Sequence, residues 1–413
     1  MKQGWEVRTL GDLANVKGGK RVPKGYRLET EKTDYPYIRV TDFNDEGSVD
    51  LTDIHYVNRE VFEQIKNYTI TNNDLYISIA GTIGKTGIIP AELNGANLTE
   101  NACKLVFKAN VDPKFVYYFT KTESFINQAG LNTRIAAMPK LALTRLSTIS
   151  FLFPKSLPEQ QRIVTILDEA FAAIAQAKAN AEQNLKNVKE LFESYLQSVF
   201  ENKGEGWINT SIGETCNLQT GGTPSTSKKE FYDGGSIKWL VSGDINQKII
   251  NDCEGRITEL GMNSSNTKYL PVNSVLIALN GQGKTRGTVA MLKTKASCNQ
   301  SLVSIYPKDD NSLLPELIFS NLEGRYEEIR RMTGDSGNDR RGLNMPLIRS
   351  IKFSYPKNLT DQKDIILKLD NLRTRTKQLE AIYQQKINDL DELKKSILQK
   401  AFAGELNTTA LEV

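Results

Sequence analysis

The chain has 413 residues, of which 39% are hydrophobic and 25% are charged. This length exceeds one ordinary domain and predicts two or three, and the composition excludes a largely disordered chain. The formal net charge of +4 is too small to predict a binding partner by itself.

Histidine and cysteine usage limits the chemistry open to the chain. His55 is the only histidine, which excludes a zinc triad of histidines and makes a Ser–His or Cys–His pair a poor candidate. The four cysteines form no Cys-x-x-Cys pair, so a zinc ribbon or redox dithiol is not expected. The first residues, MKQGWEVRTL, contain no apolar signal core, and no run of 18 apolar residues occurs. We expect a reducing, cytoplasmic location and no membrane.

The first 155 residues predict a mixed α/β region, which we call the first reader. The apolar, β-branched runs YPYIRV, LYISIAG, CKLVF and TISFLF predict strands, and Gly, Asn, Asp and Pro between them predict turns. The stretch PKFVYYFTKTESFINQ predicts a helix.

A long helix is predicted over residues 157–202. Ser156 and Glu159 form a capping-box pattern, and residues 157–202 contain no glycine and no proline after Pro158. Apolar or long side chains then recur with alternating spacings of four and three, the seam of a coiled coil. About 40 residues at 1.5 Å each span roughly 60 Å, longer than the face of one domain. The seam positions seven apart are Leu167, Ile174, Ala181, Val188 and Tyr195.

The second half repeats the first at an offset of 202 residues, which indicates an internal duplication. Trp207 corresponds to Trp5. Residues 351–370 (IKFSYPKNLTDQKDIILKLD) match residues 149–168 (ISFLFPKSLPEQQRIVTILD). Gly18-Gly19 matches Gly221-Gly222 after a one-residue slip. The second seam is Leu369, Thr376, Tyr383, Leu390 and Ile397.

These patterns predict an α+β fold (mixed α/β) with a pseudo-twofold internal repeat. Two globular domains, the readers, are separated by two long antiparallel coiled-coil helices. The predicted boundaries are 1–155 and 204–356 for the two readers, and 156–203 and 357–413 for the helical spacers.

Motifs for catalysis are missing. Gly-Lys-Thr occurs at 84–86 and 283–285, but Ile79 and Ala278 stand where a phosphate-binding loop needs its first glycine. A tight turn carrying a basic residue is the better interpretation. His55 lies in DIHYV, a predicted strand, and is expected to be a structural or surface histidine. We expect no catalytic residue, metal or cofactor in this chain.

Two readers on paired helices suit a target with two separated parts, and duplex DNA has approximate dyads that match an internal duplication. Basic side chains in polar loops are candidate contacts, because Arg can bond guanine and Lys neutralises phosphate. Each one taken alone is explained more readily as a solvated charge. The candidates are Lys20, Arg21, Lys24, Arg27, Lys85 and Arg134 in the first half, and Lys228, Lys229, Lys284, Arg286, Arg330, Arg331, Arg340 and Arg341 in the second.

Several motifs together resemble the specificity (S) subunit of type I restriction-modification systems, over nearly the full length. They are the Trp-x-x-x-x-Leu/Ile-Gly-Asp/Glu openings at Trp5 and Trp207, GTIGKTG at 81–87 and LPEQQRI at 157–163. The second helix start reads LTDQKDI (359–365), which departs but keeps Leu, Gln and Ile, and the turn at 280–287 is one residue shorter.

This resemblance implies that each reader recognises half of a bipartite DNA sequence and that the helices set the gap. It also implies docking of two modification (methyltransferase) subunits, which carry S-adenosylmethionine and methylate adenine N6, and of two restriction/translocase subunits for ATP-dependent cleavage. S-adenosylmethionine, ATP and Mg²⁺ are expected on those partners and none on this chain. An adenine rotated out of the stack must reach the methyltransferase, so the reader's position selects the base.

Two alternatives stay open on the sequence alone. One is a coiled-coil scaffold that bridges two proteins without reading DNA, and the other is the specificity chain of a related type II-like system. An enzyme is the weakest interpretation, because the catalytic motifs are missing.

Overall fold

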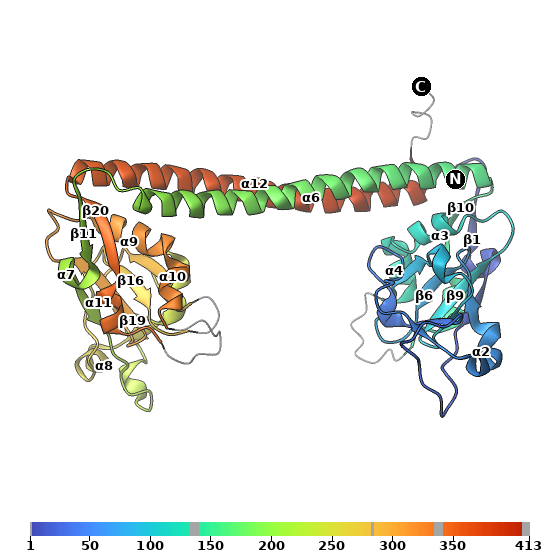
Figure 1. The fold of residues 1–413 in the computed structure, drawn as a ribbon, viewed down its shortest axis with the longest axis horizontal. Coiled ribbons are helices and arrows are strands. Elements are labelled where there is room, and N and C mark those ends of the chain that lie inside the picture. Colours follow the sequence, from blue (N-terminus) through green and yellow to red (C-terminus); the bar gives the residue numbers. More distant parts are fainter. Residues whose placement is uncertain (1, 132–139, 282–284, 334–341, 407–413) are drawn as a thin grey trace, which may run out of the picture. The chain divides into compact units, whose positions relative to one another are not determined.

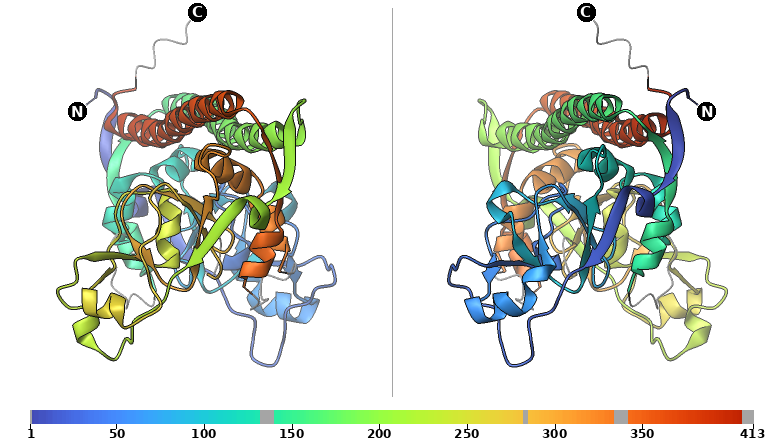
Figure 2. Two further views of the ribbon diagram at one scale, coloured as in Figure 1. Left: turned by 90° about the vertical axis from the view of Figure 1, so that its left-hand side faces the viewer. Right: turned by 90° about the vertical axis from the view of Figure 1, so that its right-hand side faces the viewer.

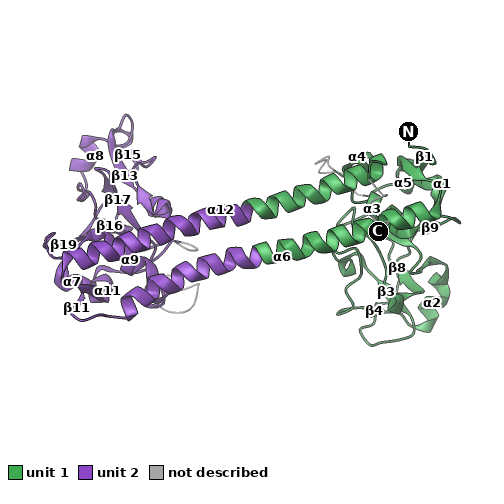
Figure 3. Cartoon of the chain, turned by 90° about the horizontal axis from the view of Figure 1, so that it is seen from above, with its two compact units in different colours: residues 1–181, 385–413 green, residues 182–384 purple. Residues whose placement is uncertain are grey.

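A computed structural model describes residues 2–131, 140–281, 285–333 and 342–406. The chain forms two compact units, residues 1–181 with 385–413 (unit 1) and residues 182–384 (unit 2) (Figure 3). The two long helices, α6 (Leu157–Glu201) and α12 (Leu359–Ala403), both pass from one unit into the other. Each unit therefore holds one reader, the first part of one long helix and the last part of the other.

The first reader contains a four-stranded antiparallel sheet, β2-β9-β6-β7, and a second sheet, β4-β3-β8-β5, in which β3 and β8 are parallel. A separate ribbon pairs β1 with β10. The elements are β1 (Trp5–Thr9), α1 (Leu10–Leu13), β2 (Ala14–Gly18), β3 (Pro36–Ile38), β4 (His55–Tyr56), α2 (Arg59–Ile65), β5 (Thr69–Ile70), β6 (Leu75–Ser78), β7 (Thr86–Ile88), β8 (Ala96–Leu98), β9 (Ala102–Phe107), α3 (Pro113–Phe119), α4 (Glu123–Ala129), α5 (Leu143–Thr148) and β10 (Ser150–Pro154).

The second reader repeats this plan with a five-stranded sheet, β12-β19-β16-β17-β14, a three-stranded sheet, β15-β13-β18, and the ribbon β11-β20. The elements are β11 (Trp207–Ser211), α7 (Ile212–Thr215), β12 (Cys216–Thr220), β13 (Ile237–Leu240), β14 (Ile249–Ile250), β15 (Arg256–Ile257), α8 (Glu259–Asn263), β16 (Val275–Ala278), β17 (Val289–Leu292), β18 (Ser297–Cys298), β19 (Leu302–Pro307), α9 (Pro315–Gly324), α10 (Tyr326–Arg331), α11 (Met345–Ser350) and β20 (Lys352–Pro356).

The long helices cover one side of each reader. In unit 1, α3 lies between the sheet and the long helices, and in unit 2 α9 does the same (Figure 1). Helices α2 and α8 lie on the opposite side of their readers (Figures 1 and 2). The predicted fold class and the four predicted strands are confirmed. The predicted helix over 113–128 is divided into α3 and α4, because Thr122 ends one turn and caps the next through Phe125 N.

The repeated Trp-x-x-x-x-Leu/Ile-Gly-Asp/Glu motif builds the joint between ribbon and sheet. Asp12 and Thr9 exchange the two hydrogen bonds of a capping box on α1, and on α7 Glu214 accepts the matching bond from Ser211 N (2.7 Å). The backbone N–H of Thr9 holds the pKa of Asp12 below its ordinary value. The motif glycine is needed because a Cβ at Gly11 would meet the carbonyl oxygen of Ser147 at 3.0 Å.

A second repeated glycine marks a close approach of two backbones. A Cβ at Gly19 would lie 2.1 Å from the carbonyl oxygen of Thr99, and one at Gly221 would lie 1.8 Å from that of Cys298. Gly19 and Gly221 are 202 residues apart, and each directly follows its strand, β2 or β12. The predicted one-residue slip at this glycine pair is therefore wrong, because the offset of 202 holds without it.

Within each unit, α6 and α12 pack antiparallel. Leu167 and Leu398 share the core of unit 1, and Leu196 and Leu369 share the core of unit 2. The predicted seam residues seven apart are buried or half-buried with one exception, Tyr195, which is 38% exposed. Leu196 takes the inward position instead, because a helix of 3.6 residues per turn drifts by about 20° per heptad against a 3.5 repeat. Three intermediate seam positions of α12, which the alternating spacing also predicts to be inside, are exposed, namely Leu379, Lys386 and Leu393.

Each long helix is joined to its reader by a buried glutamine. Gln160 accepts a hydrogen bond from Asp112 N (2.8 Å) and donates to the carbonyl oxygens of Asn110 (3.1 Å) and Pro154 (3.0 Å). Gln362 makes the same three bonds 202 residues later, from Leu314 N (2.9 Å) and to Ser312 and Pro356 (2.8 Å each). Both glutamines have 0% exposure.

The four cysteines are buried thiols, and burial raises the pKa of Cys103 and Cys298 to about 12 and of Cys216 to about 11. Because the thiolate is the reactive form, we expect iodoacetamide at pH 8 to label these three at least ten times more slowly in the folded chain than in urea. Mass spectrometry of labelled peptides checks this. Equal rates in the two conditions would contradict it.

Among the described residues, no helix has both the length and the apolar character needed to cross a membrane.

Candidate nucleic-acid interface

The segment between β2 and β3 brings four of the predicted contacts together in the first reader. Lys20, Arg21, Lys24 and Arg27 are all exposed. Lys20 Nζ lies 5.7 Å from the ring centre of Tyr68, and Arg21 forms an ion pair with Glu100. The segment is therefore a basic surface whose cations are oriented by a ring and a carboxylate of the same reader.

A hollow of about 620 Å³ lies beside this segment, and it was not foreseen from the sequence. Its walls include Arg21, Tyr26, Arg39, Thr82 and Glu100. Arg39 is held by Asp42 (Nη2 to Oδ1, 2.7 Å) and Asp53 (Nη2 to Oδ2, 3.0 Å).

His55 belongs to the same network. Its Nε2 lies 3.2 Å from Arg39 Nη1, and its Nδ1 lies 3.0 Å from the carbonyl oxygen of Asp53. The only histidine thus takes part in a hydrogen-bond network within the first reader. Arg39 lies within the predicted strand YPYIRV, and nothing in that pattern pointed to its three partners, Asp42, Asp53 and His55.

Lys85 lies in the turn between β6 and β7, as predicted for Gly-Lys-Thr, but its side chain is engaged within the reader. Its Nζ donates to the carbonyl oxygen of Phe43 (2.8 Å) and lies 3.1 Å from Asp45 Oδ1. The ammonium therefore holds the turn against the loop that carries Asp45. Of the predicted contacts in this half, Arg134 lies outside the described residues.

Lys121 lies next to this turn. Its Nζ donates to the carbonyl oxygen of Thr86 (3.1 Å) and lies 4.7 Å from the ring centre of Tyr117. Burial, and then the nearby Lys394, lower the pKa of Lys121 to about 8.

The pKa of Lys121 in the folded chain lies below its pKa in the unfolded chain. Between pH 8 and about 10.5, Lys121 is therefore mostly neutral in the folded chain and mostly protonated in the unfolded chain. The contribution of Lys121 to the free energy of unfolding should therefore increase as the pH rises from 8 to about 10.5, and it should be lowest below pH 8. Lys121→Met should stabilise the protein by about 1–3 kcal/mol at pH 7, and the advantage should shrink toward pH 10.5. Urea unfolding of both proteins at several pH values measures the difference, and a pH-independent difference would contradict the prediction.

The second reader places Lys228 and Lys229 in the matching segment, between β12 and β13. Both are exposed, and Lys228 Nζ lies 5.1 Å from the ring centre of Phe231. The two readers therefore share a basic segment at the same point of the fold, with different residues in it.

The expectation that Arg286 lies on a contact surface is wrong, because it is 7% exposed. Helix α10 covers this part of the turn, where a Cβ at the neighbouring Gly287 would lie 3.7 Å from Ile329. Arg330 is half-buried, with Nη1 donating to Tyr326 Oη (2.7 Å), whereas Arg331 is exposed. Lys284, Arg340 and Arg341 lie outside the described residues.

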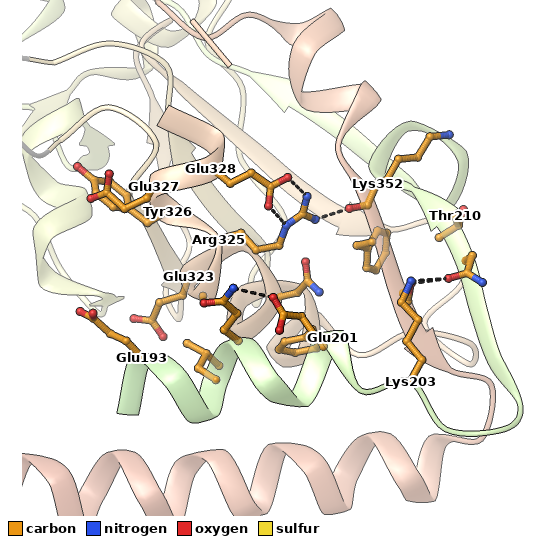
Figure 4. Close-up of a pocket in the computed structure, with 18 of the residues that line it drawn as sticks. Glu193, Glu201, Lys203, Thr210, Glu323, Arg325, Tyr326, Glu327, Glu328 and Lys352 are labelled. Atoms are coloured by element: carbon orange, nitrogen blue, oxygen red, sulfur yellow. Dashed lines mark hydrogen bonds and ion pairs between the residues drawn. The ribbon is translucent and has the colours of Figure 1, made fainter. Parts of the chain in front are cut away.

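A larger hollow, about 1160 Å³, lies in unit 2 between the last turns of α6, helix α10 and strand β20 (Figure 4). Glu193, Glu323 and Glu327 lie at one end of it, and Arg325 pairs with Glu328. The repeat explains the hollow. Phe119 stacks on Phe151 in unit 1 with ring centres 3.9 Å apart, and 202 residues later Asn321 takes its place.

The amide oxygen of Asn321 has no hydrogen-bond partner among the described residues, although the side chain is 2% exposed. Asn321→Leu should therefore raise the free energy of unfolding by about 1–2 kcal/mol, because it removes a buried unpaired oxygen and adds apolar contact. The reciprocal change, Phe119→Asn, should lower it by about 3–5 kcal/mol. Urea unfolding followed by circular dichroism compares them. A destabilised Asn321→Leu would show that the oxygen is satisfied.

Family comparison identifies both halves separately. The model of the type I restriction modification DNA specificity domain matches residues 2–187 and 204–389, two segments that begin 202 residues apart. The chain is similar to the type I restriction enzyme EcoR124I/EcoR124II specificity subunit of Escherichia coli, with 30% identity over 224 residues, and it spans 54% of that relative's length. It is also similar to the StySPI specificity subunit of Salmonella potsdam, with 22% identity covering 98% of this chain and 90% of the relative.

Two solved structures share the fold. A chain from a study of complex assembly and conformational transition of the type I R-M system matches with a TM-score of 0.79 and 16% identity, covering 98% of this chain and 99% of that one. The HsdS subunit of Thermoanaerobacter tengcongensis matches with a TM-score of 0.66 and 17% identity, covering 98% of each chain. With two matched specificity domains that together span most of its length, the chain belongs to the type I restriction-modification DNA specificity family.

Proposed function

We propose that the chain is the DNA-recognition subunit of a type I restriction-modification complex, and that each reader recognises one part of a bipartite, gapped target. The observation that carries this proposal is the pair of specificity domains, each with an exposed basic segment at the same point of its fold. The anchoring residues, such as Gln160 and Gln362, repeat, whereas the basic segments differ. Different segments on a common framework suit two readers with different short sequences.

The helices, in this proposal, fix the gap between the two half-sites and dock two methyltransferase subunits, and two restriction subunits complete the complex. The chain itself contributes no catalytic residue. S-adenosylmethionine, ATP and Mg²⁺ belong to the partner subunits. Because host DNA and these small molecules occur together in the cytoplasm, we place the complex there.

Methylation mapping tests the proposal. Cells that carry the chain with its methyltransferase subunit should show one asymmetric adenine-methylated motif with a fixed gap. Replacing residues 1–155 with another reader should change only one half of that motif. A continuous motif, or a change in both halves, would contradict two independent readers.

Charge reversal separates DNA reading from the scaffold alternative. Changing Lys20, Arg21, Lys24 and Arg27 to Glu should weaken binding of the assembled complex to its target by about 10²-fold or more, and increasingly so at low salt. Lys228→Glu with Lys229→Glu is the matched change in the other reader, and each set should relax a different half of the motif. Unchanged DNA binding by both sets would favour a scaffold.

A further inference from the structure

In unit 1 the two long helices touch through a charged pair and a cation–ring pair. Lys178 Nζ lies 2.7 Å from Asp391 Oδ1 and 2.8 Å from its Oδ2. Lys394 Nζ lies 5.1 Å from the ring centre of Phe171. In both pairs one residue belongs to α6 and the other to α12.

The repeat relates each of these residues to one in unit 2 at the offset of 202. Lys178 corresponds to Glu380, and Asp391 corresponds to Lys189, so the charges have exchanged helices. Phe171 corresponds to Arg373, and Lys394 corresponds to Phe192. The second cation–ring pair is also formed, with the Arg373 guanidinium 5.5 Å from the ring centre of Phe192. The cation–ring pair is thus kept with its members reversed, whereas Lys189 and Glu380 keep opposite charges without forming an ion pair in the described structure.

This exchange distinguishes a partner helix from a copy of the same helix. If α6 paired with α6 of a second chain in the same antiparallel register, Lys178 would face Lys189. If α12 paired with another α12, Glu380 would face Asp391 and Arg373 would face Lys394. Three of the four contacts would then join like charges, and only Phe171 with Phe192 would be favourable.

The apolar contacts do not distinguish α6–α12 pairing from pairing of two copies of the same helix. Leu398 and Phe402 of α12 pack on the first reader, and their repeat equivalents, Leu196 and Phe200 of α6, pack on the second. Either helix would therefore pack a leucine and a phenylalanine against either reader. Most seam positions are likewise apolar in both copies.

We propose that the exchanged residues at 178, 189, 380 and 391, with the two cation–ring pairs, direct α6 to pair with α12 and disfavour pairing of two α6 helices or two α12 helices from different copies. Pairing of a helix with a second copy of itself is a particular problem for a duplicated chain, because the two halves have similar apolar surfaces. The exchange resolves it at little cost, since the Lys178–Asp391 pair and both cation–ring pairs are formed within one chain.

Two sets of substitutions in the full chain test the inference. Lys178→Glu with Asp391→Lys keeps an opposite-charge pair within the chain, but it also gives opposite charges between two copies of α6 and between two copies of α12. Adding Lys189→Glu and Glu380→Lys restores like charges between copies. After unfolding and refolding at several concentrations, light scattering should show monomer for the natural chain and the fourfold variant. The twofold variant should dimerise, with an association constant about 10²–10³-fold higher.

The alternative double change, Lys189→Glu with Glu380→Lys, should dimerise in the same way through different residues. Circular dichroism and the melting temperature show whether each variant keeps its helices. The difference between twofold and fourfold variants should shrink in 1 M salt, where the screening length is about 3 Å. Equal dimer fractions for the twofold and fourfold variants at every concentration would overturn the inference.

Discussion

Gln160→Leu is expected to lower the free energy of unfolding of unit 1 by about 3–5 kcal/mol. Leucine has nearly the size of glutamine but leaves Asp112 N and the carbonyl oxygens of Asn110 and Pro154 without their partner. Each buried polar group left unpaired costs about 1–3 kcal/mol. The side chain has 0% exposure, and its bond to the carbonyl oxygen of Pro154 is fully buried.

The neighbouring Gln161 is exposed and provides the matched control. Gln161→Leu should change stability by less than about 0.5 kcal/mol. Gln362→Leu should reproduce the large loss in unit 2, since the three bonds are the same. Urea unfolding followed by circular dichroism measures all three, and a loss below about 1 kcal/mol for Gln160→Leu would refute the role assigned to it.

The glutamines show what the sequence can predict and where it stops. The repeat marked both as retained within otherwise different helix starts. It did not show that their side chains bond three backbone groups of the reader, because two of the three groups lie about 50 residues away along the chain. Local spacing predicts an element, whereas a contact between distant segments depends on how the elements pack.

The long helices were predictable because their signal is periodic and uninterrupted. Along α6, only the position of the seam differed from the prediction, by one residue near the end of the helix, so that Leu196 is buried in place of Tyr195. The basic loops were harder. Lys20 and Lys228 are exposed as expected, but Arg286 is buried under α10 and Lys85 is bonded to Phe43 and Asp45. A loop sequence gives the charge of a side chain without its direction.

We predict that the last turn of α12 is anchored on the first reader by one aromatic ring, that of Phe402. Phe402 lies 5.0 Å from Phe115, 5.7 Å from Phe119 and 6.4 Å from Phe151, measured between ring centres. Phe402→Ala should lower the free energy of unfolding of unit 1 by about 3–4 kcal/mol, because it removes three ring contacts and leaves a cavity. Hydrogen exchange should also accelerate in the last turns of α12, where the amides depend on this packing.

Phe200, the repeat equivalent of Phe402, is the control that separates ring contacts from burial alone. It is 8% exposed, but its ring partner is Trp207, 6.5 Å away, and it lines the hollow that Asn321 leaves in unit 2. Because packing around it is already incomplete, Phe200→Ala should cost about half as much as Phe402→Ala. Losses of equal size, measured by urea unfolding, would mean that burial and not the aromatic cluster holds the helix. An unequal loss would mean that the replacement of Phe119 by Asn321 has made the two readers differ in how firmly they hold the helices.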